Sequence, residues 1–258
     1  MSEPTFVHLH APKLRLVYDH QKHEADDAVA QLLPYVSETP EVIAVIGGDG
    51  MMLRAIRQHW QDGLPFYGLN TGHLGFLLNE VRVPFWHGQL RRYRLPLLEV
   101  EMLTDDGDRR REIAFNDCWI ERETGQTAWI EVRINGEIRM PRLIADGLLV
   151  ASAAGSTSYA RAMGASPLPF NANLLTLAGS NVLLPAFWRP AVLPPSSRIC
   201  LRNLAPDKRP LRGFVDSLAR GRIVEMTVAQ STANFVELLF APEYDPVSKL
   251  AITQFPQF

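Results

Sequence analysis

Three glycines and one carboxylate follow a short apolar run in the first fifth of the chain. Residues 42–46, VIAVI, lead directly into Gly47, Gly48, Asp49 and Gly50. Glycine lacks a Cβ atom and tolerates positive φ, so phosphate groups can approach the backbone amides of such a loop, and a following helix N-terminus favours negative charge. A carboxylate beside phosphates is unfavourable unless a metal ion or a substrate hydroxyl accompanies it. We therefore interpret Asp49 as a proton acceptor or hydroxyl anchor; the alternative is a simple tight turn.

A second polar group lies at residues 152–159, where the apolar stretch 147–151 ends. Thr157 and Ser158 precede Tyr159 at the expected start of a helix. Hydroxyl groups and free amides at a helix N-terminus can donate to phosphate or ribose oxygens, and a tyrosine ring can stack on a base. An ordinary helix cap followed by a core tyrosine is the alternative interpretation.

A third polar pair, Asn116 and Asp117, interrupts the alternating stretch 114–122, AFNDCWIER. Small polar side chains inside a strand suggest a buried polar edge that binds hydroxyl groups. A β-bulge or an edge strand would give the same pattern.

The elements that must position these groups differ between the two parts of the chain. Before Pro96, residues 13–17 and 66–69 read as short strands, 42–46 as a strand buried on both faces, and 19–34 and 51–60 as helices. This alternation predicts a doubly wound α/β domain over residues 1–95.

Beyond Pro96 the apolar residues follow a period of two, with turn residues between the stretches. Asn135-Gly136 is a type I′ hairpin signal and Asp106-Gly107 marks another turn. A single helix is expected from Gly155 toward Met163, and strands at 198–204, 211–215, 223–228 and 236–240. Residues 96–258 are therefore predicted to form a mainly antiparallel β domain, whose last residues, unassigned from Pro242 onward, could return to the first domain.

Composition narrows the class of protein. The chain has 258 residues, 26 Lys and Arg against 28 Asp and Glu, and 47% hydrophobic residues. The net charge of −2 excludes a protein that wraps nucleic acid electrostatically, and no apolar run reaches the roughly 18 residues needed to span a membrane. The N-terminus lacks the pattern of a signal peptide, so a cytoplasmic location is expected. Two cysteines, Cys118 and Cys200, read as ordinary half-buried thiols.

Other polar groups in the sequence predict no metal site. His8-Leu9-His10 and His20-x-x-His23 lack further ligands at zinc spacing and read as surface residues. Residues 105–108, DDGD, lack the distal glutamate of a calcium loop and read as a hairpin turn. His73 is expected to shape a pocket rather than to react.

Taken together and in this order, the motifs resemble those of the NAD kinase family. The matching segments are GGDG at 47–50, NTGHLGFL at 70–77, ND at 116–117, DGLLVASAAGSTSYARAMG at 146–164, RPAVLP at 189–194, and a late aspartate, Asp216. The resemblance covers residues 13 to about 230. It implies an α/β nucleotide-binding domain followed by a largely β domain, and transfer of a phosphoryl group from ATP, or from polyphosphate, to the 2′-hydroxyl of the adenosine ribose of NAD.

The resemblance also implies roles for individual residues. Asp49 would deprotonate the ribose hydroxyl, and Gly47, Gly48, Gly50 and Met51 would form the phosphate-donor loop. The NAD site would comprise Asp49, Gly50, Phe76, Asn116, Asp117, Asp146, Thr157, Ser158, Tyr159, Ala162, Asp216 and Ser217, with Asp146 near the nicotinamide half or contributed by a neighbouring subunit. A divalent cation, typically Mg²⁺, and assembly into homodimers or homotetramers are implied as well. No residue of the protein is assigned as a metal ligand, and from the charge and the apolar runs no nucleic-acid or membrane partner is expected.

The sequence departs from the family pattern at several of these positions. The family usually has GGDGT, and Met51 removes that hydroxyl from the donor loop. Asp117 replaces the usual glutamate, and residues 152–159 lose a proline and one hydroxyl of the usual TPTGSTAY. Two alternatives therefore stay open: a kinase of the same superfamily with another substrate, and a dinucleotide-binding protein with weakened catalysis. The donor, the choice between NAD and NADH, and any allosteric regulation are left undetermined.

Overall fold

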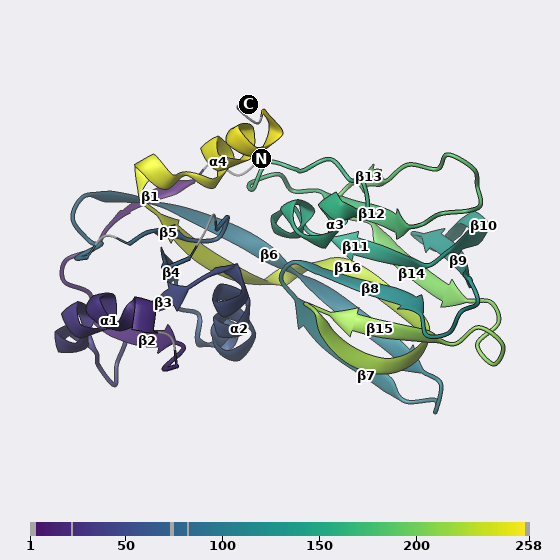
Figure 1. Ribbon diagram of the computed structural model, residues 1–258, viewed down its shortest axis with the longest axis horizontal. Helices are drawn as coiled ribbons and strands as arrows, with labels where there is room; N and C mark the ends of the chain where they lie inside the picture. The colour runs from purple at the N-terminus through teal and green to yellow at the C-terminus, as the bar shows by residue number, and fades with distance from the viewer. Residues whose placement is uncertain (1–3, 22, 73–74, 82, 256–258) are drawn as a thin grey trace. The chain divides into compact units, whose positions relative to one another are not determined.

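The computed structural model describes residues 4–21, 23–72, 75–81 and 83–255 (Figure 1). It divides into two compact units. Unit 1 comprises Met1–Leu95, Pro169–Asn171 and Asn234–Phe258, and unit 2 comprises Pro96–Leu168 and Ala172–Ala233. The C-terminal segment thus belongs to the same unit as the N-terminal segment.

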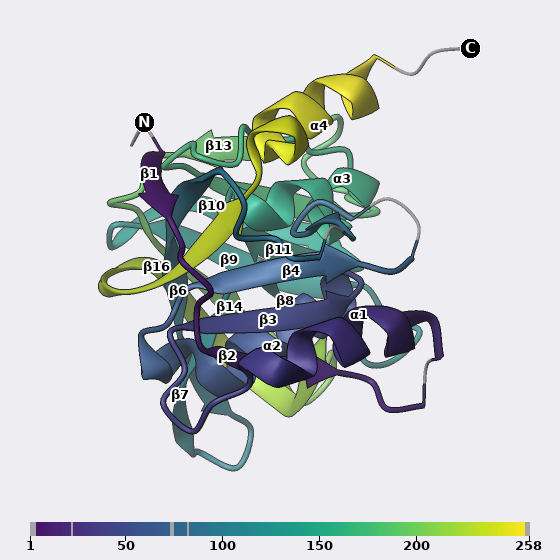
Figure 2. The same cartoon turned by 90° about the vertical axis from the view of Figure 1, so that its left-hand side faces the viewer.

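Unit 1 is built on three parallel strands, β2 (Leu14–Tyr18), β3 (Val42–Gly47) and β4 (Phe66–Asn70), which lie side by side in that order (Figure 2). Residues 42–46 of β3 are at most 1% exposed, because β3 pairs on both edges and apolar side chains cover both of its faces. Helix α2 (Asp49–His59) follows β3 and ends in the 3₁₀ turn η3 (Trp60–Asp62). These strands and this helix confirm the α/β prediction.

The predicted helix over 19–34 is shorter than expected. Among the described residues of this range, 19–21 and 23–34, only α1 (Asp26–Leu32) is α-helical, flanked by the 3₁₀ turns η1 (His23–Ala25) and η2 (Leu33–Tyr35). Pro34 lies within η2 and cannot donate a helical hydrogen bond, so the helix ends before it.

Strand β4 has two short partners on its second edge. Phe66 and Tyr67 pair with Leu238 and Leu239 near the end of β16 (Leu218–Phe240), whereas the other end of β4 pairs with β5 (Asn79–Glu80). The fully buried Asn79 amide joins these segments: Nδ2 donates to the carbonyls of Gly68 and Leu239, both at 3.1 Å, and Oδ1 accepts from the amide of Ala241 at 2.8 Å. The Asn79 side chain therefore ties the returning chain to β4, in addition to the backbone pairing of β16 with β4.

The segment that the sequence left unassigned forms the 3₁₀ turn η5 (Pro242–Tyr244) and the helix α4 (Pro246–Gln254). Strand β1 (Thr5–His8) adds to unit 1 by pairing with the first residues of β6 (Gln89–Thr104).

Unit 2 is mainly antiparallel β-structure, as predicted. Besides parts of β6 and β16, it contains β7 (Arg109–Ala114), β8 (Asp117–Arg122), β9 (Ala128–Ile134), β10 (Glu137–Ala145), β11 (Gly147–Ala151), β12 (Leu175–Ser180), β13 (Ala191–Leu193), β14 (Arg198–Asn203) and β15 (Leu211–Val215). Alternate side chains of β6 and β14, such as Leu98, Val100, Ile199 and Leu201, are fully or nearly fully buried in one apolar core.

Local turn chemistry is confirmed in unit 2. Asn135 (φ +53°) and Gly136 (φ +85°) join β9 to β10 with the two positive φ values of a type I′ turn. Residues 105–108 form the turn between β6 and β7, with Gly107 at φ +89°.

The structure corrects three predictions for residues 96–258. The helix expected from Gly155 toward Met163 is a 3₁₀ turn, η4 (Ala154–Thr157), followed by the single turn α3 (Tyr159–Ala162), because Ser158 between them is not helical (φ −94°, ψ −128°). The two strands expected at 223–228 and 236–240 are parts of the continuous β16. Cys118 is fully buried rather than half-buried.

Candidate active site

Asp49 lies in the first turn of α2, directly after the glycines that end β3. Gly47 has φ +154°, and a Cβ atom there would lie 3.0 Å from the Cβ of Met51, so the chain can turn into α2 only with glycine at this position. The amides of Met51 and Met52 donate to the carbonyl of Gly48, which starts the helix. The glycine loop therefore places the half-buried Asp49 side chain at the carboxyl end of a central parallel strand, where ligands of such sheets bind.

Both oxygens of the Asp49 carboxylate are held by backbone amides. Oδ2 accepts from the amide of Phe76 at 3.0 Å and Oδ1 from the amide of Leu77 at 2.9 Å. The predicted site residues Asp49 and Phe76 are thus adjacent, although the contact is made through the backbone of Phe76. A carboxylate fixed in this way keeps further lone pairs on both oxygens, so it can still accept a proton or a hydroxyl hydrogen bond.

In unit 2, Asn116 and Asp117 lie where β7 ends and β8 begins. Strand β8 is not an edge strand, because β11 and β15 pair with its two sides. The sequence alternative of an edge strand is therefore wrong, and the polar pair instead marks the break between two strands. Both side chains are buried, with 7% and 3% of their surface exposed.

Asp216 fixes the backbone of this pair. Its buried carboxylate accepts from the amides of Phe115 (2.8 Å), Asn116 (2.8 Å) and Asp117 (3.3 Å). Asp216 can reach them because it lies in a tight turn between β15 and β16, in which Asp216 and Ser217 have φ values of +43° and +67°. The structure thus brings Asn116, Asp117 and Asp216 together, with Asp216 acting on the backbone.

The chemistry of Asp117 is changed by these surroundings. Burial, followed by the charge of Asp216, raises the pKa of Asp117 to about 7. A carboxyl group that is partly protonated at neutral pH can both donate a hydrogen bond to a hydroxyl group and accept one from it.

The Asn116 side chain supplies an unused acceptor. Within the part of the chain that the structure describes, its buried Oδ1 atom has no hydrogen-bond partner. Leaving a buried acceptor unpaired costs about 1–3 kcal/mol, so the site is suited to a ligand that brings a donor such as a hydroxyl group.

The η4 turn packs directly against Asn116. The amide of Ser152 donates to the carbonyl of Asn116 at 2.8 Å, and Ser152 Oγ donates to the carbonyl of Phe115 at 2.7 Å. A Cβ atom on Gly155 would lie 2.1 Å from the backbone carbonyl oxygen of Asn116, so only glycine allows this approach. The resemblance to the family's Gly-Ser-Thr frame therefore has a structural reason at Gly155.

The remaining predicted residues of this segment have different surroundings. Thr157 Oγ1 donates to the carbonyl of Ala154 at 3.3 Å, whereas Ser158 and Ala162 are exposed. Tyr159 is 41% exposed, and its ring centroid lies 5.2 Å from that of Trp119. The hydroxyl of Ser156, which the sequence analysis did not select, donates to the carbonyl of Ala153 and accepts from the amide of Leu168. It serves the local fold.

Asp146 lies apart from this group. It precedes β11, whereas Asp117 pairs with Ala151 at the other end of that strand. Asp146 forms an ion pair with Arg122 at 2.6 Å and accepts from Asn181 Nδ2 at 2.8 Å.

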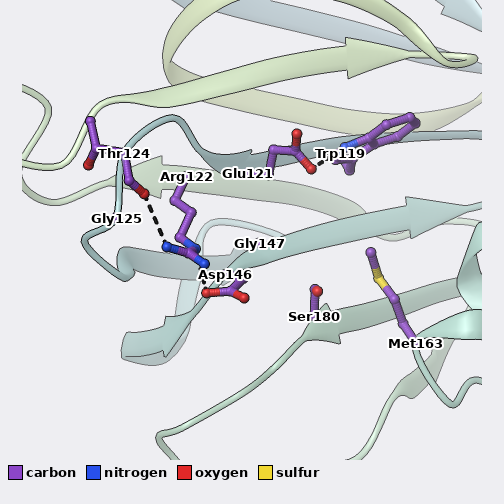
Figure 3. Close-up of a pocket in the computed structure, with 9 residues that line it drawn as sticks. All are labelled: Trp119, Glu121, Arg122, Thr124, Gly125, Asp146, Gly147, Met163 and Ser180. Atoms are coloured by element: carbon purple, nitrogen blue, oxygen red, sulfur yellow. Dashed lines mark hydrogen bonds and ion pairs between the residues drawn. The ribbon is translucent and has the colours of Figure 1, made fainter.

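A pocket of about 470 Å³ surrounds the Arg122–Asp146 ion pair. In Figure 3 the Arg122 side chain points toward Asp146, and the sulfur of Met163 and the ring of Trp119 form another part of the wall. The lining residues are Trp119, Glu121, Arg122, Thr124, Gly125, Asp146, Gly147, Met163 and Ser180. Sequence reasoning selected only Asp146 among them as a site residue. Gly147 and Met163 lie in the same matching segment, 146–164, whereas the others belong to no motif and are brought here by the pairing of β8, β11 and β12.

The histidine pairs gave no metal site. His23 contacts Asp26 at 3.0 Å with 90% of its side chain exposed, and among residues 4–21, 23–72, 75–81 and 83–255 no three His, Cys, Asp or Glu side chains gather in a way that could hold a metal ion. His73 lies outside the described residues. None of the described helices is long and apolar enough to cross a membrane.

Comparisons with known proteins agree with these motifs. The family model for the N-terminal domain of ATP-NAD kinases matches residues 7–90. An NAD kinase of Hyphomonas neptunium is 33% identical over 245 residues, covering 92% of this chain and 96% of the relative, and one of Xylella fastidiosa is 34% identical over 220 residues, covering 84% and 85%.

Solved structures share the fold. A yeast NADH kinase in complex with NADH has a TM-score of 0.79 at 16% identity, covering 99% of this chain and 95% of that one. An NAD kinase from Archaeoglobus fulgidus in complex with ATP has a TM-score of 0.72 at 18% identity, covering 92% and 98%. With a relative 33% identical over almost its whole length, this chain belongs to the NAD kinase family.

Proposed function

We propose that this protein is an NAD kinase, which transfers a phosphoryl group from ATP to the 2′-hydroxyl of the adenosine ribose of NAD and so produces NADP. The observation that carries the proposal is the buried, unpaired Asn116 Oδ1 atom next to Asp117, within the described part of the chain. This acceptor and a carboxyl group with a pKa of about 7 match the two adjacent hydroxyl groups of a ribose, each of which can donate and accept.

Unit 2 supplies the binding groups for the dinucleotide in this proposal. Asn116 and Asp117 bind ribose hydroxyls, and Asp216, with Ser217 in the same turn, holds their backbone in place. The exposed Ser158, Tyr159 and Ala162, with Thr157, form a wall at which the tyrosine ring can stack on a base. The pocket beside Asp146 receives a more distant part of a dinucleotide, since Asp146 lies at the other end of β11 from Asp117.

Unit 1 supplies the group that accepts the proton. Asp49 removes the proton from the 2′-hydroxyl as the ribose oxygen bonds to the γ-phosphorus, and the bond from that phosphorus to the bridging oxygen breaks to release ADP. Gly47, Gly48 and Gly50 carry no Cβ atom where phosphates approach, and Met51 follows them in the first turn of α2.

We expect a divalent cation to enter this site bound to the nucleotide, as the resemblance to the family implies. Mg²⁺ commonly binds substrate phosphates and water with few protein ligands. We therefore expect the triphosphate oxygens to hold Mg²⁺, which neutralises phosphate charge. Asp49 is the carboxylate of the glycine loop.

Three further features belong to the proposal. Leu183, Leu184 and Phe187 are 62%, 46% and 95% exposed, and such exposed apolar side chains favour assembly into a homodimer or homotetramer. Both cysteines are free thiols, which fits the reducing cytoplasm. ATP is the expected donor, with polyphosphate as the alternative to assay beside it.

The test is NADP formation by the purified protein. It is incubated with NAD, Mg²⁺ and either ATP or polyphosphate, and NADP is measured with an NADP-specific dehydrogenase. Asp49→Asn keeps the shape of the side chain but removes the base, so we expect kcat to fall by about 10²–10⁴-fold. Asp27→Asn, an exposed aspartate on α1, is the matched control and should retain full activity. No NADP with either donor, while calorimetry still detects NAD binding, would contradict the proposal.

A further inference from the structure

The C-terminal helix α4 places a lysine against the segment that holds Asp49. Lys249 Nζ donates to the backbone carbonyl of Gly75 at 2.9 Å and to that of Leu78. The side chain is half-buried, and a lysine so placed loses part of its hydration, which the two carbonyl oxygens replace.

The same short segment therefore makes two sets of contacts. The carbonyls of Gly75 and Leu78 accept from Lys249, while the amides between them, those of Phe76 and Leu77, donate to the two oxygens of Asp49. The space is also tight, because a Cβ atom on Gly75 would lie 3.2 Å from Asp49 Oδ1 and 2.9 Å from Leu78 Cδ1. A shift of this segment would move the Asp49 carboxylate with it.

Helix α4 is itself firmly anchored in unit 1. Asp245, which precedes the helix, is buried, accepts from the hydroxyl of Tyr93 and pairs with Arg91 at 3.1 Å. Tyr244 donates to Glu80 Oε2 at 2.9 Å, and Leu250 is 6% exposed. Lys249 thus extends from a fixed element.

We propose that Lys249 is a positioning residue for Asp49: its ammonium group holds the Gly75–Leu78 segment so that the Phe76 and Leu77 amides fix the carboxylate that accepts the proton. The proposal rests on the proposed function of Asp49. It assigns the C-terminal helix a part in the reaction geometry, although Lys249 is not expected to touch either substrate.

The charge of Lys249 affects how strongly its side chain holds the Gly75–Leu78 segment. Burial lowers the pKa of Lys249, and the charges of Asp49 on α2 and Glu80 on β5 partly oppose this effect. Hydrogen bonds from an ammonium group are about twice as strong as those from a neutral donor. Deprotonation of Lys249, at a pH below the ordinary value for lysine, should therefore loosen the segment.

The first measurement compares Lys249→Met with Lys208→Met, an exposed lysine of unit 2. Since misplacement of a reacting group costs up to about 10²-fold in rate, we expect Lys249→Met to lower kcat by about ten- to a hundredfold, with KM for NAD changed less than about twofold. Lys249→Arg, which keeps the charge, should recover at least part of kcat. It should also move the alkaline decline of kcat to higher pH. Lys208→Met should behave as the unchanged protein.

The second measurement is amide hydrogen exchange, which needs no activity. In Lys249→Met the amides of Phe76 and Leu77 should exchange at least about tenfold faster, while amides of β3 and β4 stay protected. Unchanged exchange at these two amides, or equal loss of protection throughout unit 1, would overturn the proposal. An unchanged kcat in an active protein would overturn it too. If the unchanged protein forms no NADP, the proposed function fails, and localised exchange at Phe76 and Leu77 still decides whether Lys249 holds the segment.

Discussion

Two aspartates, one in each unit, bind backbone amides in similar ways but in different surroundings. Asp49 accepts from two amides and stays half-buried. Asp216 accepts from three and is 2% exposed. The amide contacts alone therefore do not distinguish a reacting carboxylate from a structural one. We propose that access to a ligand distinguishes them: the half-buried Asp49 is the reacting carboxylate, and the buried Asp216 positions the backbone of Asn116 and Asp117.

The largest effect that we expect is a change of stability with pH, and it arises beside Asp216. Asp117, next to Asp216, has its pKa raised to about 7, above the value of about 3.9 in an unfolded chain. The folded state then binds the proton more tightly, so the stability from this group is present below about pH 4 and is lost as pH rises toward 7 and above. The free energy of unfolding should fall by about 1 kcal/mol per pH unit across that window relative to Asp117→Asn.

Urea unfolding of the unchanged protein and Asp117→Asn at several pH values between 4 and 8 measures this difference. Carboxylates whose pKa is lowered by ion pairs, such as Glu101 beside Arg198, give an opposite trend in both proteins and cancel in the comparison. Parallel stability curves for the two proteins would show that the pKa of Asp117 is not raised.

Replacing Asp216 with asparagine should produce the next largest effect. The new side chain would turn an amide nitrogen toward backbone donors that the carboxylate now binds, so at least one charge-assisted hydrogen bond is lost. We expect the free energy of unfolding to fall by about 2–3 kcal/mol and KM for NAD to rise, since Asn116 and Asp117 lose their support.

The corresponding change in unit 1 sharpens the contrast. Asp49→Asn removes the proton acceptor, but the side chain at this position is half-exposed. The free energy of unfolding of the protein should therefore change by less than about 1 kcal/mol. Urea unfolding and steady-state kinetics on both variants check the pair. If Asp49→Asn is as destabilising as Asp216→Asn, the two carboxylates have the same structural role and the distinction by access fails.

The sequence predicted what depends on local patterns. The continuous apolar run of β3, the glycines after it and the Asn135-Gly136 turn each have a nearby cause, and each was found where the pattern indicated. The GGDG and Asn-Asp motifs could be selected for the same reason, because residue type and order carry their chemistry.

The contacts that complete the two regions could not be predicted, since their partners are far apart in the chain. Asp216 lies 100 residues from Asn116, and Lys249 lies 174 residues from Gly75. No spacing rule links such positions, and Lys249 belongs to a tail whose helix has little apolar periodicity to reveal it. The long strand β16 was split for a related reason: its polar middle section, near Gln230, breaks the alternation although the strand continues.

The smallest effect that we expect comes from replacing Met51, and this effect concerns unit 1 alone. The side chain follows the glycine loop in the first turn of α2, and its Cβ atom would lie 3.0 Å from a Cβ on Gly47. Met51→Thr adds a hydroxyl group where the family usually has one, and one added hydrogen bond to a donor phosphate is worth about 1 kcal/mol. We therefore expect KM for ATP to fall by about two- to fivefold with kcat little changed.

Steady-state kinetics at varied ATP and saturating NAD measure this, and Met51→Leu, which adds no hydroxyl, serves as the control. Equal effects of threonine and leucine would assign the change to packing against Gly47, and a rise in kcat of more than about tenfold in Met51→Thr alone would mean that the methionine disturbs Asp49 itself.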